Sequence, residues 1–126
     1  MTIALTSGEP SGIGPDIAII CAQKDRTKNL RVYADPDALI ERAKLLNLPL
    51  ILKESSTNKA GELSIFPIKS KEKTVPGQLN PNNAEYVLSI IKQATHDCLN
   101  KTCNGILTGP INKAVINQAG IKFSGH

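Results

Sequence analysis

Two short segments rich in glycine carry polar groups at a spacing that suits binding of an anionic ligand. The first runs from Ser7 to Pro15 and contains Gly8, Gly12 and Gly14 together with the carboxylate of Glu9. Glycine lets the backbone approach a ligand closely, and the free N–H groups at the start of a following helix favour negative charge. A tight structural turn is the alternative interpretation, because glycine turns before helices are common.

The second segment begins at Thr108 and Gly109 and continues to Asn112 and Lys113. It places a hydroxyl, an amide and an ammonium group around the start of another predicted helix, where phosphate or carboxylate would be stabilised. Lys113 is therefore the main candidate for anion binding, and Asn112 is the expected helix cap. The alternative for Lys113 is an exposed lysine in the first turn of a helix.

Standard nucleotide and metal motifs do not fit the chain. The glycine spacing is not a dinucleotide fingerprint, because Ile17 stands where the last glycine is needed, and no Lys-Ser or Lys-Thr pair follows as in a Walker loop. The chain has only two histidines, His96 and His126, and no acidic cluster at ligand spacing. We therefore predict no self-contained metal site, and we expect His96 to be exposed because it lies off the apolar face of its helix.

Apolar runs and turn residues alternate in a way that predicts strands followed by helices. The expected strands are Thr2–Thr6, Leu30–Ala34, Leu50–Leu52, Leu63–Phe66 and a buried strand at Gly105–Leu107. The expected helices are 16–23, one that starts at Pro36 with Asp35 as its cap, one from an Asn80 cap to Lys101, and 112–119.

Between these elements, Glu54 to Glu62 is predicted to be an exposed turn, and Lys69 to Leu79 an irregular connection. In the long helix, the residues expected to face the core are Ala84, Val87, Leu88, Ile91, Thr95 and Cys98.

This alternation predicts an α/β fold with three layers and a mostly parallel sheet. In such sheets, ligands bind beyond the carboxyl ends of the strands. The segments from Ser7 and from Thr108 both leave strands at that end. We therefore expect the two candidate loops to open on the same side of one sheet.

Composition narrows the class of protein. The 126 residues are 40% hydrophobic and 21% charged, as in one globular domain, and the aromatic content of 3% with no Trp argues against nucleic-acid binding. The basic residues behind the net charge of +4 are dispersed, except for a cluster from Lys69 to Lys73 that we interpret as a solvated loop. The net positive charge would suit a small phosphorylated substrate. The three cysteines include no Cys-x-x-Cys pair, and we find neither a leader nor a membrane span. We therefore expect a cytoplasmic location.

Four segments taken in order resemble the 4-hydroxythreonine-4-phosphate dehydrogenase family: Thr6–Asp16, Pro76–Pro81, Thr108–Lys113 and Ser124–His126. The resemblance implies a fold similar to isocitrate and isopropylmalate dehydrogenases. It also implies that residues 1–126 are the N-terminal part of a two-domain α/β/α subunit that forms a homodimer, with the sheet incomplete and the remainder absent from this chain.

The same resemblance implies a reaction: NAD or NADP oxidises 4-phosphooxy-L-threonine, carbon dioxide is lost, and a divalent metal (zinc, magnesium or cobalt) assists, in pyridoxal phosphate biosynthesis. It implies substrate binding by His126, which matches the His of the family's Gly-His pair, although the Thr that usually follows is absent. The metal ligands of the family belong to segments beyond residue 126. We therefore expect the isolated chain to be inactive.

Two other functions fit the same residues. A related dehydrogenase could act on a four-carbon sugar-acid phosphate or on threonate, since the same loops could serve either substrate. A binding or dimerisation module without catalysis could retain the first half of the fold. The sequence leaves open NAD against NADP, the metal and the oligomeric state.

Overall fold

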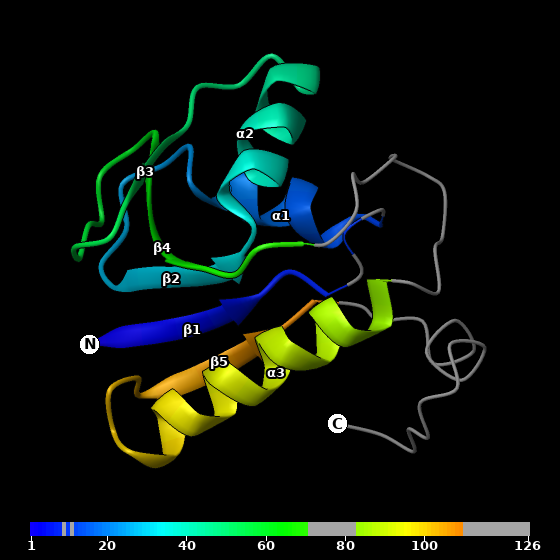
Figure 1. Cartoon of the computed structure of the whole chain (residues 1–126). Coiled ribbons are helices and arrows are strands. Elements are labelled where there is room, and N and C mark those ends of the chain that lie inside the picture. Colours follow the sequence, from blue (N-terminus) through cyan, green and yellow to red (C-terminus); the bar gives the residue numbers. More distant parts are fainter. Residues whose placement is uncertain (9, 11, 71–82, 110–126) are drawn as a thin grey trace.

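A computed structural model of the chain describes residues 1–8, 10, 12–70 and 83–109. In chain order its elements are β1 (Thr2–Thr6), α1 (Gly14–Cys21), β2 (Asn29–Ala34), α2 (Pro36–Leu45), β3 (Ile51–Lys53), β4 (Glu62–Pro67), α3 (Ala84–Leu99) and β5 (Gly105–Thr108). The five strands form one sheet in the order β3-β4-β2-β1-β5, and every neighbouring pair is parallel (Figure 1). The predicted parallel α/β class is confirmed.

Helices cover both faces of this sheet (Figure 1). Neighbouring residues of β2 show the two sides, because successive side chains of a strand point to opposite faces. Val32 packs in a buried cluster with Ile19 of α1 and Leu39 of α2, whereas Tyr33 packs with Ile90 of α3. Burial of each such aliphatic side chain stabilises the fold by roughly 1.5–3 kcal/mol. The predicted three layers are therefore present in the described part of the chain.

Helix α2 begins where the local sequence predicts it. The Asp35 carboxylate accepts hydrogen bonds from the N–H groups of Asp37, at 2.9 Å, and Ala38, at 3.5 Å. Pro36 needs no such partner, because it has no N–H. The backbone N–H of Asp35 donates to the Tyr86 hydroxyl at 2.7 Å, so the cap also ties the end of β2 to α3.

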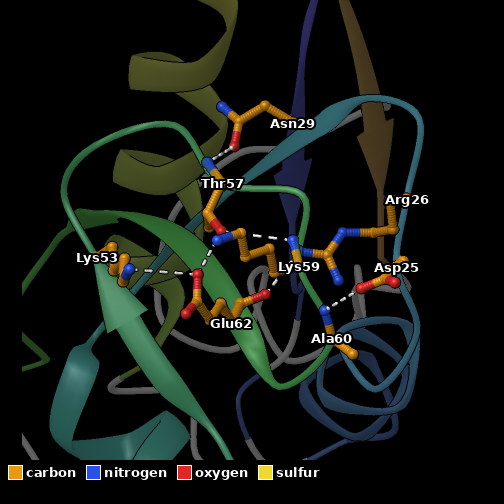
Figure 2. A network of polar contacts seen from close by, with 8 residues as sticks. All are labelled: Asp25, Arg26, Asn29, Lys53, Thr57, Lys59, Ala60 and Glu62. Carbon is orange, nitrogen blue, oxygen red and sulfur yellow. Dashed lines mark hydrogen bonds and ion pairs between the residues drawn. The ribbon is translucent and has the colours of Figure 1, made fainter.

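Residues 54–61 form a crossover, because β3 and β4 are parallel and the chain must return to the amino end of the sheet. The crossover is anchored to the connection between α1 and β2 (Figure 2). Arg26 donates its N–H to the Asn58 carbonyl at 2.7 Å, and the Thr57 N–H donates to the Asn29 side chain at 2.9 Å. Most of the segment is exposed, as predicted, although the structure makes it an anchored crossover rather than a simple turn.

Glu62, predicted as the last residue of that turn, is the first residue of β4. Its carboxylate accepts a hydrogen bond from the Thr57 hydroxyl at 2.6 Å and lies 3.3 Å from the Lys53 ammonium (Figure 2). The Thr57 hydrogen bond is the largest cause that lowers the pKa of Glu62 below its ordinary value, and Lys53 adds to the effect. Glu62 therefore fastens the crossover in its ionised form.

Helix α1 starts at Gly14, before the predicted start at Asp16, and ends at Cys21 rather than Gln23. Ile13 already has helical backbone angles at the N-cap, with φ −85° and ψ −10°. The glycine at the following position is compatible with this early start, since Gly14 lies against the backbone of Ser7. The loop is thus shorter than the sequence suggested.

Helix α3 buries most of the face predicted for it: Ala84 and Val87 are buried, and Leu88, Ile91 and Cys98 are partly buried against the same cluster. Thr95 was expected to face the core but is exposed, whereas Tyr86, Ile90 and Asp97 are buried. The reason is that polar atoms on this face have partners across the core: the Tyr86 hydroxyl accepts from Asp35, and Asp97 accepts from Tyr33. The predicted cap at Asn80 lies outside the described residues, as do the connection from 71 to 79 and the helix at 112–119.

Strand β5 is present but is not buried as predicted. Ile106 is 39% exposed and Leu107 is 56% exposed. Among the described strands, β5 pairs only with β1, so it is the edge of the sheet in this part of the chain. Within the described ranges, no helix has the length and apolar character needed to cross a bilayer.

Candidate functional site

The two candidate loops begin side by side at the carboxyl edge of the sheet (Figure 1). In the parallel pairing of β1 with β5, Thr6 is the register partner of Thr108. Ser7 and Gly109 therefore follow neighbouring strands at the same edge. The predicted placement of the loops is confirmed for their described residues, whereas ligand binding by them stays a prediction.

The boundary between β1 and β5 is a topological switch point. From β1 the chain continues through α1 to β2 on one side, whereas β5 enters on the other side of β1 after α3. In open α/β sheets, the crevice beyond the strand ends at such a point is the usual place for a ligand. The topology thus favours the same edge as the two polar loops.

Two glycines of the candidate site make room for one carbonyl group. A Cβ on Gly14 would lie 1.6 Å from the Ser7 carbonyl oxygen, and a Cβ on Gly109 would lie 2.6 Å from that oxygen. Gly109 also donates its N–H to the Thr6 carbonyl at 2.5 Å. Both glycines therefore have a packing role that is independent of any ligand, and for Gly14 this role agrees with the structural-turn interpretation.

Gly8 has a different reason to be glycine. Its φ of +72° lies in the left-handed region, which side chains with a Cβ rarely adopt. The chain thus turns sharply just after β1, before it reaches Gly12 and α1. This turn and the Ser7 contact fix both ends of the segment that we call the 7–14 loop, of which residues 7, 8, 10 and 12–14 are described.

Arg42 of α2 holds the middle of the 7–14 loop and was missed by the sequence interpretation. Its guanidinium donates to the Pro10 carbonyl at 2.8 Å and to the Gly12 carbonyl at 3.0 Å, and it pairs with the Asp16 carboxylate at 2.6 Å. The Arg42 side chain is only 8% exposed. The sequence does contain a signal for this role. Arg42 comes three residues after Leu39, so it lies on the apolar face of its helix, where a charged side chain needs partners.

A second buried polar group lies between β2 and α3. The Tyr33 hydroxyl donates to the Asp97 carboxylate at 2.5 Å and lies 3.4 Å from the Cys103 sulfur. Gln93 donates to the other Asp97 oxygen at 3.1 Å. Burial, with the Asp97 hydrogen bond, raises the pKa of Tyr33 far above its ordinary value of 10.0, so the hydroxyl stays protonated. We assign this group a structural role.

Several predicted site residues cannot be placed. Glu9, Asn112, Lys113 and His126 lie outside the described residues. His96 is exposed on α3, as predicted. Across residues 1–8, 10, 12–70 and 83–109, no group of three or more His, Cys, Asp or Glu side chains could hold a metal ion.

Comparison with known proteins decides the family. A family model described as "Pyridoxal phosphate biosynthetic protein PdxA" matches residues 26–126. The chain belongs to this family. A PdxA relative from Saccharophagus degradans, named 4-hydroxythreonine-4-phosphate dehydrogenase, is 45% identical over 98% of this chain and 38% of its own length. A relative of the same name from Serratia proteamaculans is 42% identical over 98% of this chain and 39% of its own length.

Solved structures support the fold. A 4-hydroxythreonine-4-phosphate dehydrogenase from Klebsiella pneumoniae matches 99% of this chain and 41% of its own, with a TM-score of 0.82 and 23% identity. A protein of that name from Burkholderia phymatum matches with a TM-score of 0.86 and 19% identity, over 99% of this chain and 41% of its own. The chain thus spans about two fifths of the length of its PdxA relatives.

Proposed function

We propose that this chain is part of an enzyme that oxidises and decarboxylates 4-phosphooxy-L-threonine with NAD or NADP in pyridoxal phosphate biosynthesis. The observation that carries the proposal is the 45% identity, over 98% of the chain, to a relative named for this activity. The family description, which refers to pyridoxal phosphate biosynthesis, supports the same assignment. The loops at the switch point are the proposed place for the anionic substrate.

The 7–14 loop and the Thr108 loop are the proposed substrate contacts. The N–H groups at the start of α1 (Gly14–Cys21) carry partial positive charge, which favours a phosphate or carboxylate. Lys113 would add a full positive charge, and Asn112 and His126 would add hydrogen bonds. The net charge of +4 would attract the same ligand over a longer range.

The cofactor belongs to the proposal for the whole protein. NAD or NADP would accept the hydride from the substrate carbon that bears the hydroxyl group. A divalent metal, zinc, magnesium or cobalt, is also proposed, with ligands outside this chain. A two-domain subunit, a cytoplasmic location and a homodimer complete the proposal, and we infer that residues 1–126 alone bind substrate without turning it over.

Two measurements test the proposed function. First, amide NMR of the purified chain titrated with 4-phosphooxy-L-threonine should show chemical-shift changes at Gly8, Gly12 and Gly109. The change should be small at Gly61, which directly precedes β4 at the amino ends of the strands. Second, the same chain mixed with NAD or NADP and each metal should form no NADH or NADPH. Chemical-shift changes confined to residues near Gly61 would contradict the proposed site. Metal-dependent NADH formation would refute the inactivity of the isolated chain.

A hybrid protein tests the reaction itself. Residues 1–126 would replace the matching segment of the Saccharophagus degradans relative, with the unmodified relative as control. We expect the hybrid to reduce NAD or NADP with 4-phosphooxy-L-threonine and far less with threonate. A folded hybrid with the opposite preference would favour the threonate alternative.

A further inference from the structure

We propose that Arg42 is a positioning residue for substrate binding: it fixes two loop carbonyls, those of Pro10 and Gly12, so that the backbone N–H at the start of α1 is directed toward an anionic ligand. This inference rests on the proposed function, because it assumes that the loop receives the substrate. Arg42 itself does not need to touch the substrate. It acts through the backbone of the loop.

The contacts of Arg42 are distributed along the loop rather than gathered at one point. One guanidinium nitrogen, Nη1, reaches both the Gly12 carbonyl and the Asp16 carboxylate, and the other, Nη2, reaches the Pro10 carbonyl. The planar guanidinium offers several donors in a fixed geometry, which a lysine ammonium on a flexible stem does not. Arg42 therefore fixes two carbonyls of the loop and the first turn of α1 with respect to one another.

The direction of these carbonyls determines the direction of an N–H group. In a trans peptide the N–H points opposite to the C=O of the same unit, and the described residues contain no cis peptide. Because the Gly12 carbonyl points at Arg42, the N–H of Ile13 points away from α2. Ile13 is the N-cap of α1, so this N–H belongs to the end of the helix that attracts anions.

The burial of Arg42 strengthens the inference. Its side chain is 8% exposed, whereas that of its partner Asp16 is 31% exposed. A buried ion pair is a weak source of stability, because removal of the charges from water offsets much of their attraction. Its direct consequence here is that the Pro10 and Gly12 carbonyls keep a fixed position relative to α2, which matters for a ligand that backbone groups must bind.

The experiment compares three variants of the 126-residue chain. Arg42→Met removes every donor, Arg42→Lys keeps the charge but not the planar fork, and Lys44→Met removes a charge from an exposed position of the same helix. Without ligand, hydrogen exchange of the Gly12, Ile13 and Gly14 amides reports the conformation of the loop. With 4-phosphooxy-L-threonine as the probe, NMR titration gives the affinity.

We expect Arg42→Met to speed exchange in the loop and to weaken binding about tenfold or more, the scale of one charge-assisted hydrogen bond lost between the loop backbone and the ligand. Arg42→Lys should fall between Arg42→Met and the wild type, and Lys44→Met should match the wild type within about twofold. A loss of affinity in a chain whose unfolding temperature is preserved is an effect that a purely structural role would not produce. If Arg42→Met does not fold, Arg42→Lys decides by the same two readouts.

The outcomes separate the two proposals. If the wild-type chain binds the probe and Arg42→Met, or a folded Arg42→Lys, binds it equally well, the role of Arg42 is overturned. The proposed function is unaffected by that result. A wild-type chain that binds no probe at this loop would overturn the loop as substrate site and, with it, the positioning role. Equal losses in Arg42→Met and Lys44→Met would reduce the effect to net charge and also overturn the inference.

Discussion

The carbonyl oxygen of Ser7 lies 1.6 Å from the point that a Cβ on Gly14 would occupy. The end of β1 (Thr2–Thr6) and the start of α1 (Gly14–Cys21) thus touch through backbone atoms alone. For a Cβ on Gly109, the corresponding distance to the same carbonyl oxygen is 2.6 Å. The two candidate loops therefore both lie against the carbonyl of Ser7.

Gly14→Ala should destabilise the chain by about 1–3 kcal/mol, because the new methyl group meets a backbone oxygen that cannot rotate away. The free energy of unfolding in urea measures the loss. Gly105→Ala is the matched control, because the nearest atom to its new Cβ is the end of the Ile3 side chain at 3.4 Å. Equal, small effects of both changes would show that the Ser7 contact relaxes easily.

Tyr33→Phe should destabilise the fold by about 1–3 kcal/mol, because one oxygen of the buried Asp97 carboxylate loses its donor. The ring itself should stay in place, stacked on Phe66 with centroids 5.2 Å apart. A double-mutant cycle with Asp97→Asn isolates the pair. Strictly additive effects in that cycle would contradict a direct coupling between Tyr33 and Asp97.

Both tyrosines of the chain should resist ionisation while it is folded. Burial is the first cause that raises the pKa of Tyr33 and of Tyr86 above the ordinary value of 10.0. Since the folded pKa values exceed the unfolded ones, this stabilising contribution is complete below pH 10 and is lost as the pH rises above it.

Ultraviolet absorbance of phenolate and circular dichroism, followed together through an alkaline titration, test this expectation. Phenolate should appear in step with the loss of secondary structure. Phenolate that forms near pH 10 in a chain that remains folded would contradict the buried positions of Tyr33 and Tyr86.

Glu62→Gln should reduce stability at neutral pH and have less effect in acid. The hydrogen bond from Thr57, together with Lys53, lowers the pKa of Glu62 below 4.5 in the folded chain. A lowered carboxyl pKa contributes stability above the unfolded value, and that contribution is lost as the pH falls through the folded value. Urea unfolding of both chains should therefore give a difference that narrows below pH 4.5; a constant difference would place its cause elsewhere.

The sequence by itself determined the features that depend on near neighbours. Asp35 and Pro36 predict the start of α2 because a cap acts within a few residues. The alternation of apolar runs and turns predicts a parallel sheet, and thereby the common edge where Thr6 and Thr108 are paired. The motifs also indicate the family, because their residues lie in a fixed order along the chain.

Only the tertiary structure decided which distant groups meet. Arg42 binds the Gly12 carbonyl 30 residues away, and Tyr33 binds Asp97 across 64 residues. Such partners depend on how helices and strands pack, not on local propensity. Thr95 and strand β5 were therefore wrongly predicted to be buried, and the burial of Asp97 was missed. Periodicity specifies which residues share a face, but the packed core specifies how far the buried part of that face extends.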